Sequence, residues 1–336
     1  MSQKRTYLLL GLLAAIVVLL FFPFTQPGVA QSDDILVTIY RVFALRQSWQ
    51  VGIFYPRIAP DLAFGYGAPL FQFYPPLSSY LAALFTFLGL GMVDAVKLTF
   101  AITLLGGGLG AYLFVRDRWQ DVGAGWLAAI VFVTAPYQLA NIYVRGATAE
   151  ALGLALFPWI LWCAQRLLYS KQPLRWLPWF ILTMAALLLS HNALSLFFLP
   201  IVIIACLVDG WQQRSLHGLL LCGLGVLLAL ASSAFFWLPA VWEKEQVKIA
   251  AMASGHYDPL THLQSLLAIV QQSLRFDYSR PQAYHIGWLP LVLSGLAVLL
   301  LLWRKRQQRL WIAFFALILV GALLLQLPAA ATFWRD

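Results

Sequence analysis

Ten long apolar runs recur along this chain, and they limit what it can fold into more than any other feature of the sequence. A helix needs about 17 to 25 apolar residues to cross ~30 Å of hydrocarbon, and most of the runs approach or reach that length. Lipid offers no partner to unpaired backbone groups, so runs of this kind form helices. They lie at residues 7–22, 76–90, 98–115, 123–137, 151–169, 176–189, 193–208, 216–237, 287–303 and 310–327. We therefore predict an all-α, polytopic integral membrane protein.

The composition agrees with this class and argues against others. Hydrophobic residues make up 62% of the chain and charged residues 10%, whereas about 25% of a typical soluble domain is charged. The net charge of +9 does not predict nucleic-acid binding, because the basic residues lie between apolar runs instead of on one face with stacking aromatics. All three cysteines lie inside apolar runs, which predicts small core residues and not disulfides or a metal site.

The basic residues also predict the number and direction of the spans, because Lys and Arg concentrate in cytoplasmic loops. If all ten runs crossed the membrane, most of the short basic loops would lie outside. The run at 76–90 is short, follows two prolines and is rich in Ser and Tyr, so we predict a re-entrant or interfacial helix there and about nine to ten spans in all. With nine spans the N-terminus is cytoplasmic, the inner side carries 12 Lys and Arg against 3 Asp, and the outer side carries 10 charges of each sign.

This topology places a first outer loop at 23–75, a second large outer loop at 241–286, and shorter outer segments at 138–150 and 190–192. The start of the chain also resembles a signal peptide with a cleavage position at Ala30. Its apolar run is longer than the ~7 to 15 residues of a usual signal core, so we predict a retained helix. No internal repeat or linker-like tract divides the sequence, and we expect one domain over residues 1–336, which could be the N-terminal module of a longer protein.

Two neighbouring acids that follow the first span are the candidate catalytic residues. Asp33 and Asp34 precede residues 35–50, whose apolar positions recur at helical spacing and predict an amphipathic helix at the membrane surface. In one interpretation, Ser32 caps this helix and both acids favour the positive end of its dipole. In the other, a carboxylate at the membrane surface accepts a proton from a hydroxyl or amide nucleophile.

The rest of the first outer loop is dense in Tyr, Phe, Pro and Gly, which predicts an ordered loop. An aromatic belt at the membrane interface would account for the rings, but not for Arg57 or for the glycines that permit tight turns. Arg57 is a candidate ligand for a donor phosphate, and Tyr66 and Tyr74 are candidates for lining a sugar-sized pocket.

The two shorter outer segments add further candidates for donor binding. Charges at the end of a span are costly unless paired or wet, so Arg145 and Glu150 form either a structural ion pair or a phosphate ligand with its orienting carboxylate. His191 and Asn192 lie at a break between two short apolar runs, where a histidine is either a helix cap or part of the site. No residue is assigned to a metal, because the other histidines lack the spacing of a zinc motif.

The order of these features resembles a known family. An acid follows the first span, an Arg-containing juxtamembrane helix comes next, and then the strings YPRIAPDLAFGYGAPLFQFYPPLSSYL at 55–81, YVRGATAE at 143–150 and SHN at 190–192. This pattern covers roughly residues 25–200. It resembles the bacterial membrane family catalogued as "6-pyruvoyl-tetrahydropterin synthase related", and through it the GT-C superfamily of membrane glycosyltransferases.

The resemblance implies a GT-C-like fold, a polyprenyl-phosphate-linked sugar as donor and a catalytic acid in the first outer loop. Counting back from the Ile-Tyr-Arg string at 39–41, that acid corresponds to Asp34. The family pattern has a second acid and a histidine where this chain has Leu36 and Thr38, which weakens a metal-ligand role for this turn.

The implied reaction is an inverting sugar transfer on the outer face of a bacterial cytoplasmic (inner) membrane. Asp34 would deprotonate the acceptor, which is a glycan, a lipid or a protein, while Arg57 or Arg145 stabilises the departing lipid phosphate. No cofactor is assigned, and a divalent cation stays open.

Two other function classes also stay open. A non-catalytic carrier or flippase for lipid-linked sugars would use the same basic and aromatic surface without a carboxylate base, and a structural subunit of a membrane complex would bury its outer loops against partners. A pterin enzyme is not expected, because the sequence lacks a zinc-binding histidine cluster.

Overall fold

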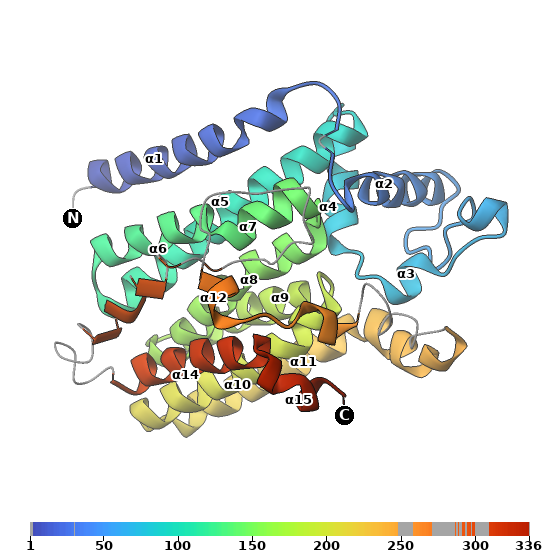
Figure 1. Ribbon diagram of the computed structural model, residues 1–336. Coiled ribbons are helices and arrows are strands. Elements are labelled where there is room, and N and C mark those ends of the chain that lie inside the picture. The colour runs from blue at the N-terminus through green and yellow to red at the C-terminus, as the bar shows by residue number, and fades with distance from the viewer. Residues whose placement is uncertain are drawn as a thin grey trace. The chain divides into compact units, whose positions relative to one another are not determined.

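The computed structural model describes residues 3–29, 31–247, 258–270 and 309–335, together with a few residues between 286 and 299. Within these ranges the secondary structure is helical, and the one strand-like pairing is an isolated bridge between Ala59 and Ala68. This confirms the all-α, polytopic class. The chain falls into two compact units, Met1–Val241 and Trp242–Asp336. Figure 1 labels the helices of the described residues. The expected single domain over 1–336 stays a prediction.

The first unit contains eleven described α-helices, among them those that carry the candidate site. They are α1 (Gln3–Phe21), α2 (Ile35–Gln50), α3 (Leu70–Phe73), α4 (Leu77–Thr86), α5 (Met92–Trp119), α6 (Val122–Thr134), α7 (Pro136–Ala140), α8 (Thr148–Tyr169), α9 (Leu177–Leu188), α10 (Asn192–Gln213) and α11 (Leu216–Trp242), which ends at the unit boundary. The described helices of the second unit are α12 (Leu266–Val270), α14 (Arg309–Gln326) and α15 (Ala331–Arg335).

Six helical segments within the described residues are long and apolar enough to cross a membrane. They are Met92–Trp119, Val122–Arg145, Thr148–Tyr169, Asn192–Gln213, Leu216–Trp242 and Arg309–Gln326. Each of the first five covers one predicted run, and the last ends one residue before the run at 310–327 does. Three further predicted runs form shorter apolar helices, at Leu9–Thr25, Leu77–Thr86 and Pro173–Leu188. The run at 287–303 lies largely outside the described residues, so the count of nine to ten spans stays a prediction.

Helix α5 is central to the first unit and packs against α1, α4, α6 and α8. Its close approach to two neighbours depends on glycine. A Cβ atom at Gly107 would lie 2.2 Å from the ring of Phe132 in α6, and one at Gly110 would lie 2.7 Å from the indole of Trp159 in α8. Small residues let membrane helices gain van der Waals contact where lipid supplies no hydrophobic driving force. The GGGLG run at 106–110 therefore positions α6 and α8.

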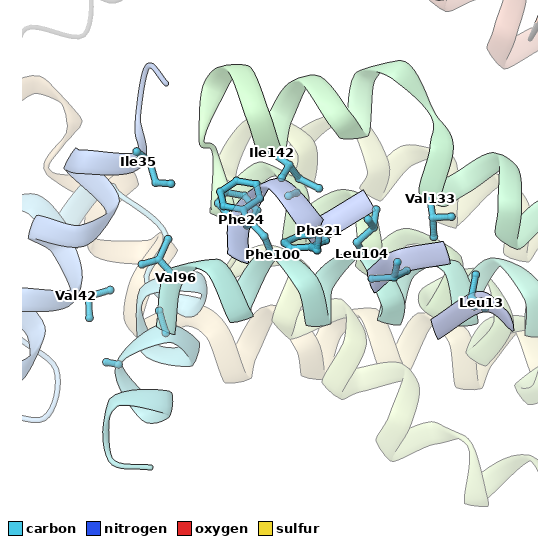
Figure 2. Packing of buried hydrophobic residues seen from close by; sticks show 14 of the residues in the cluster. Leu13, Phe21, Phe24, Ile35, Val42, Val96, Phe100, Leu104, Val133 and Ile142 are labelled. Carbon is cyan, nitrogen blue, oxygen red and sulfur yellow. The ribbon is translucent and has the colours of Figure 1, made fainter. Parts of the chain in front are cut away.

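Helix α2 spans the residues predicted for the juxtamembrane helix and packs its apolar side on α4 and α5. Ile35 and Val42 are buried there with Val96 of α5, as Figure 2 shows. In the same core, the ring of Phe24 stacks on Tyr143 with centroids 4.9 Å apart. These contacts hold the start of α2 close to the segment that precedes α8.

A second apolar core joins α8, α9, α10 and α11. It contains all three cysteines, Cys163, Cys206 and Cys222, which are buried and free. The prediction that they are small core residues is confirmed. This core holds the start of α10 against α8, which places the His191–Asn192 break beside the first turn of α8.

Candidate functional site

The two candidate catalytic acids lie in a turn that is hydrogen-bonded to the YVRG segment more than a hundred residues later. The backbone N–H of Asp33 donates to the carbonyl of Val144 at 3.0 Å, and that of Asp34 donates to the carbonyl of Arg145 at 2.7 Å. Gly146 follows with a left-handed φ of +65°, which ends the π-helical turn η3 (Asn141–Arg145). A non-glycine residue rarely adopts this conformation, so the glycine allows the acid turn to dock.

Asp34 occupies the N-cap position of α2, and its carbonyl accepts a hydrogen bond from the N–H of Thr38 at 2.9 Å. Its side chain makes no capping hydrogen bond, and the buried hydroxyl of Ser32 has no partner among the described residues. The interpretation of Ser32 as the cap was therefore wrong. The N-cap position belongs to Asp34, two residues after Ser32, because α2 begins at Ile35. Asp34 is half-buried whereas Asp33 is exposed, and the Asp34 carboxylate is not used to cap the helix.

Tyr74 lies at the centre of the candidate site. The guanidinium carbon of Arg41 lies 3.6 Å from the centroid of its ring, a cation–π contact. Burial raises the pKa of the Tyr74 hydroxyl above its usual 10, while Arg41 lowers it, Asp34 and Glu150 raise it, and Arg145 lowers it. The phenol is therefore protonated at neutral pH, and it is within electrostatic range of two carboxylates and two guanidiniums.

Arg145 and Glu150 form an ion pair. This contact fits both predicted interpretations, since a structural pair and a phosphate ligand with its orienting carboxylate both require it. The hydroxyl of Tyr137 donates to the other carboxylate oxygen of Glu150, and Arg145 donates to the side-chain oxygen of Asn141 at 3.0 Å. The Glu150 side chain is 8% exposed and that of Arg145 is 28% exposed. Glu150 is thus buried beneath a guanidinium that is open to the surface on one side.

His191 fits both predicted roles. Its Nδ1 atom accepts a hydrogen bond from the N–H of Leu194 at 3.3 Å and so caps α10, while its Nε2 atom lies 3.9 Å from Glu150. Burial lowers the pKa of His191, Glu150 raises it by a smaller amount and Arg145 lowers it, so the imidazole is neutral at pH 7. The side-chain amide of Asn192 donates to the carbonyl of Phe73 at 3.0 Å, which fixes α10 next to Tyr74.

Two predicted donor-binding residues lie apart from this group, on the loop before α3. The backbone of this loop turns back between Ala59 and Ala68, and Tyr66 near its tip is 93% exposed. Arg57 is exposed, and its charge lowers the pKa of Tyr55, although burial raises that pKa overall. Neither Arg57 nor Tyr66 makes a hydrogen bond or ion pair with the central group in the part of the chain that the structure describes. Their role in donor binding stays a prediction.

We call the assembled group the Tyr74 cluster. It consists of Asp34, Arg41, Tyr74, Arg145, Glu150 and His191. Its cations suit an oxyanion such as a phosphate, and Asp34 is a carboxylate that can accept a proton. Among the described residues, no three His, Cys, Asp or Glu side chains gather as a metal ion would require.

Sequence reasoning missed three residues that shape this cluster. Arg41 follows Asp34 by seven residues, which is two helical turns and puts both on one side of α2. Tyr137, Asn141 and Arg145 follow one another at intervals of four and so share one side of a helix. Both spacings were present in the sequence and could have indicated these residues.

The fold and the cluster define a multi-pass α-helical membrane protein with a charged site where α2, α8 and α10 begin. Residues 71–335 match the family described as "6-pyruvoyl-tetrahydropterin synthase related domain; membrane protein", and the chain belongs to that family. The matched region includes Tyr74, Arg145, Glu150 and His191 and begins after Asp34 and Arg57.

The chain is also similar to an uncharacterized protein of Lactococcus lactis subsp. cremoris (strain MG1363). The two are 24% identical over 232 residues, which cover 67% of this chain and 38% of that relative. The chain thus matches well under half of the relative's length.

Proposed function

We propose that this chain is an integral-membrane glycosyltransferase that moves a sugar from a polyprenyl-phosphate donor to an acceptor with inversion. The observation that supports this best is the Tyr74 cluster. There the Asp34 carboxylate, which makes no capping hydrogen bond, and the guanidiniums of Arg41 and Arg145 all act electrostatically on Tyr74 at the end of an apolar bundle. A donor with a charged phosphate and a long apolar tail suits such a place, because the tail stays in lipid while the phosphate meets the cations.

Asp34 is the proposed base. It accepts the proton of the acceptor hydroxyl or amide as that group attacks the anomeric carbon from the side opposite the phosphate. A new bond forms at the anomeric carbon, the bond to the phosphate oxygen breaks, and the phosphate leaves with the electron pair. Asp33 is the weaker candidate, because it is exposed whereas Asp34 is half-buried beside Tyr74.

Arg41 and Arg145 are the proposed ligands of the departing phosphate. Arg41 is held on the Tyr74 ring and its buried Nε atom has no hydrogen-bond partner among the described residues, so a bound oxyanion would satisfy it. Arg145 is oriented by Glu150 and Asn141. Charge placed in advance where negative charge develops lowers the barrier without reorganisation. Arg57, which lies on the exposed loop, is a further candidate ligand for this phosphate.

The site is proposed to face the outside of a bacterial cytoplasmic membrane, with the N-terminus inside. The charge distribution supports this, because the predicted inner loops carry the excess of Lys and Arg. In that orientation the reaction draws its sugar from the lipid carrier and needs no soluble nucleotide sugar. The acceptor is a glycan, a lipid or a protein.

Transfer of radiolabelled sugar from polyprenyl-phosphate donors tests the proposal, in membranes that contain equal amounts of wild type, Asp34→Asn or Asp33→Asn. Asp33→Asn is the matched control, since it removes an adjacent charge that is exposed. We expect Asp34→Asn to lose at least 100-fold in rate, as removal of a general base does, and Asp33→Asn to stay near wild type. If the wild type binds the donor lipid but transfers no sugar from any donor, a carrier becomes the better interpretation. If the wild type neither binds the donor lipid nor transfers sugar, a structural subunit becomes the better interpretation.

A further inference from the structure

A pocket of about 380 Å³ lies between the end of α8 and the start of α9. Three basic residues, Arg166, Lys171 and Arg175, and two tryptophans, Trp176 and Trp179, line it. Its size is that of a small-molecule site. The function proposed above does not use it.

The pocket lies far from the Tyr74 cluster along α8. Glu150 in the first turn and Arg166 near the last are 16 residues apart, which is about 24 Å at 1.5 Å per residue. That separation approaches the ~30 Å thickness of the hydrocarbon core. Because α8 is long and apolar enough to cross a membrane, the pocket lies near the opposite membrane interface, whichever way the chain is oriented.

The pocket has more positive charge than its neighbouring acid can balance. Asp117 lies near Arg166, with 3.7 Å between nitrogen and oxygen, but it also pairs with Arg116 at 2.7 Å and accepts a hydrogen bond from Trp162 at 2.9 Å. Lys171 and Arg175 are exposed and make no ion pair in the described part of the chain. A bound anion would therefore meet Lys171 and Arg175, which make no ion pair in the described part of the chain, and Arg166, whose acid Asp117 also pairs with Arg116.

Aromatic rings contact the guanidinium of Arg166, whose side chain is 43% exposed. Its guanidinium carbon lies 4.8 Å from the ring centroid of Trp176, and that ring meets Trp162 edge-on at 5.0 Å. The Nε atom of Arg166 is buried and has no hydrogen-bond partner among the described residues. A guanidinium held by rings with an unsatisfied donor is prepared to bind an oxyanion, because little side-chain freedom is lost on binding.

Exposed apolar side chains occur in the pocket and next to it in the sequence. Trp179 on α9 lines the pocket and is 57% exposed, and Leu174, in the segment between α8 and α9, is 64% exposed. Tryptophan is enriched where acyl chains meet headgroups. A soluble phosphate compound would gain nothing from this surface, whereas a phospholipid would place its phosphate among the cations and its acyl chains along α9.

We infer that this pocket binds the phosphate of an anionic membrane phospholipid. Basic pockets between transmembrane helices at a membrane interface recognise such headgroups, and each Lys or Arg contributes about 1 kcal/mol, or roughly a fivefold change in affinity. No covalent step is involved. The site differs from the proposed donor site in place and in ligand, since it takes a structural lipid.

The test is binding of phosphatidylglycerol to the purified full-length protein in detergent, measured by native mass spectrometry, with phosphatidylcholine of the same acyl chains as the zwitterionic probe. The wild type should prefer phosphatidylglycerol. The double variant Lys171→Gln and Arg175→Gln should lose roughly 25-fold in that affinity, while Arg214→Gln, a basic loop residue outside the pocket, should not change it. Both pocket residues are exposed, so unchanged thermal unfolding without added lipid checks the fold.

Three outcomes would overturn the inference. Equal binding of both lipids by the wild type would remove the role of net charge. Unchanged phosphatidylglycerol binding by the double variant would place the lipid elsewhere. Displacement of phosphatidylglycerol by equimolar inorganic phosphate would show that the pocket recognises a free anion and not a lipid.

Discussion

Gly146 is the residue on which the geometry of the proposed site depends most, and Gly146→Ala should destabilise the protein. A Cβ atom there would lie 2.6 Å from the Ser32 hydroxyl, 2.8 Å from the backbone nitrogen of Ile35 and 2.9 Å from its Cβ. The hydroxyl can rotate away, but the backbone of Ile35 cannot move without breaking the hydrogen bonds that dock Asp33 and Asp34 on the YVRG segment.

The size of the effect follows from three contributions. A left-handed conformation costs alanine about 1 to 2 kcal/mol, overpacking adds about 1 to 3 kcal/mol, and the lower entropy of the unfolded alanine chain offsets about 0.4 to 1 kcal/mol. The net loss of stability is about 3 kcal/mol. Any structure that survives should also lose transferase activity, because the Asp34 turn is displaced.

The assay is reversible unfolding of the purified protein in detergent, with Gly106→Ala as the control. Gly106 lies in α5 and a Cβ atom there would meet nothing within 4 Å, so alanine should be neutral or slightly stabilising in the helix. If Gly146→Ala unfolds within 0.5 kcal/mol of the wild type, the docking of the acid turn on Gly146 is refuted.

Three further perturbations probe the Tyr74 cluster. Glu150→Gln removes the carboxylate from the ion pair with Arg145, which still donates to Asn141, and should cost about 2 kcal/mol in chemical unfolding. This is less than the cost of breaking a fully buried pair, because Arg145 is partly exposed, and equal stability of the variant and the wild type would contradict the prediction. Tyr74→Leu should lower the free energy of unfolding by about 1 kcal/mol more than Tyr74→Phe does, because only leucine loses the cation–π contact with Arg41. Equal losses of stability in the two variants would show that this contact does not stabilise the protein. The folded pKa of His191 lies below its usual 6.5, so its contribution to stability is complete above pH 6.5 and is lost as pH falls through the folded pKa. His191→Asn keeps a capping side chain and should reduce this acid-side loss, and an unchanged pH curve would argue against a buried neutral imidazole.

Much of the helical framework could be predicted from the sequence, because helix formation in lipid depends on local properties. The run at 98–115 lies within α5, and residues 35–50 form α2 with the predicted bounds. Apolar run length and helical periodicity suffice for such elements. The family was also predicted from the string motifs and is confirmed, over residues 71–335.

The assembly of the site could be predicted only in part, because it depends on contacts between segments far apart in the chain. Arg145 and Glu150 are five residues apart, so their ion pair was within reach of local reasoning. The docking of Asp34 on Arg145 was not, since it requires the left-handed Gly146 and the packing of α2 on α5. Likewise, the backbone turns back between Ala59 and Ala68, and Tyr66 is exposed. Hydrophobic periodicity in the sequence does not predict the direction of a side chain in such a loop.

The proposed glycosyl transfer is tested most directly with purified wild-type protein reconstituted in liposomes that contain a polyprenyl-phosphate sugar and candidate acceptors. The measurement is the formation of the glycosylated acceptor together with the anomeric configuration of the new bond. The account predicts product whose configuration is opposite to that of the donor and whose formation is lost with Asp34→Asn. Retention of configuration, or product formation that is unaffected by Asp34→Asn, would contradict it.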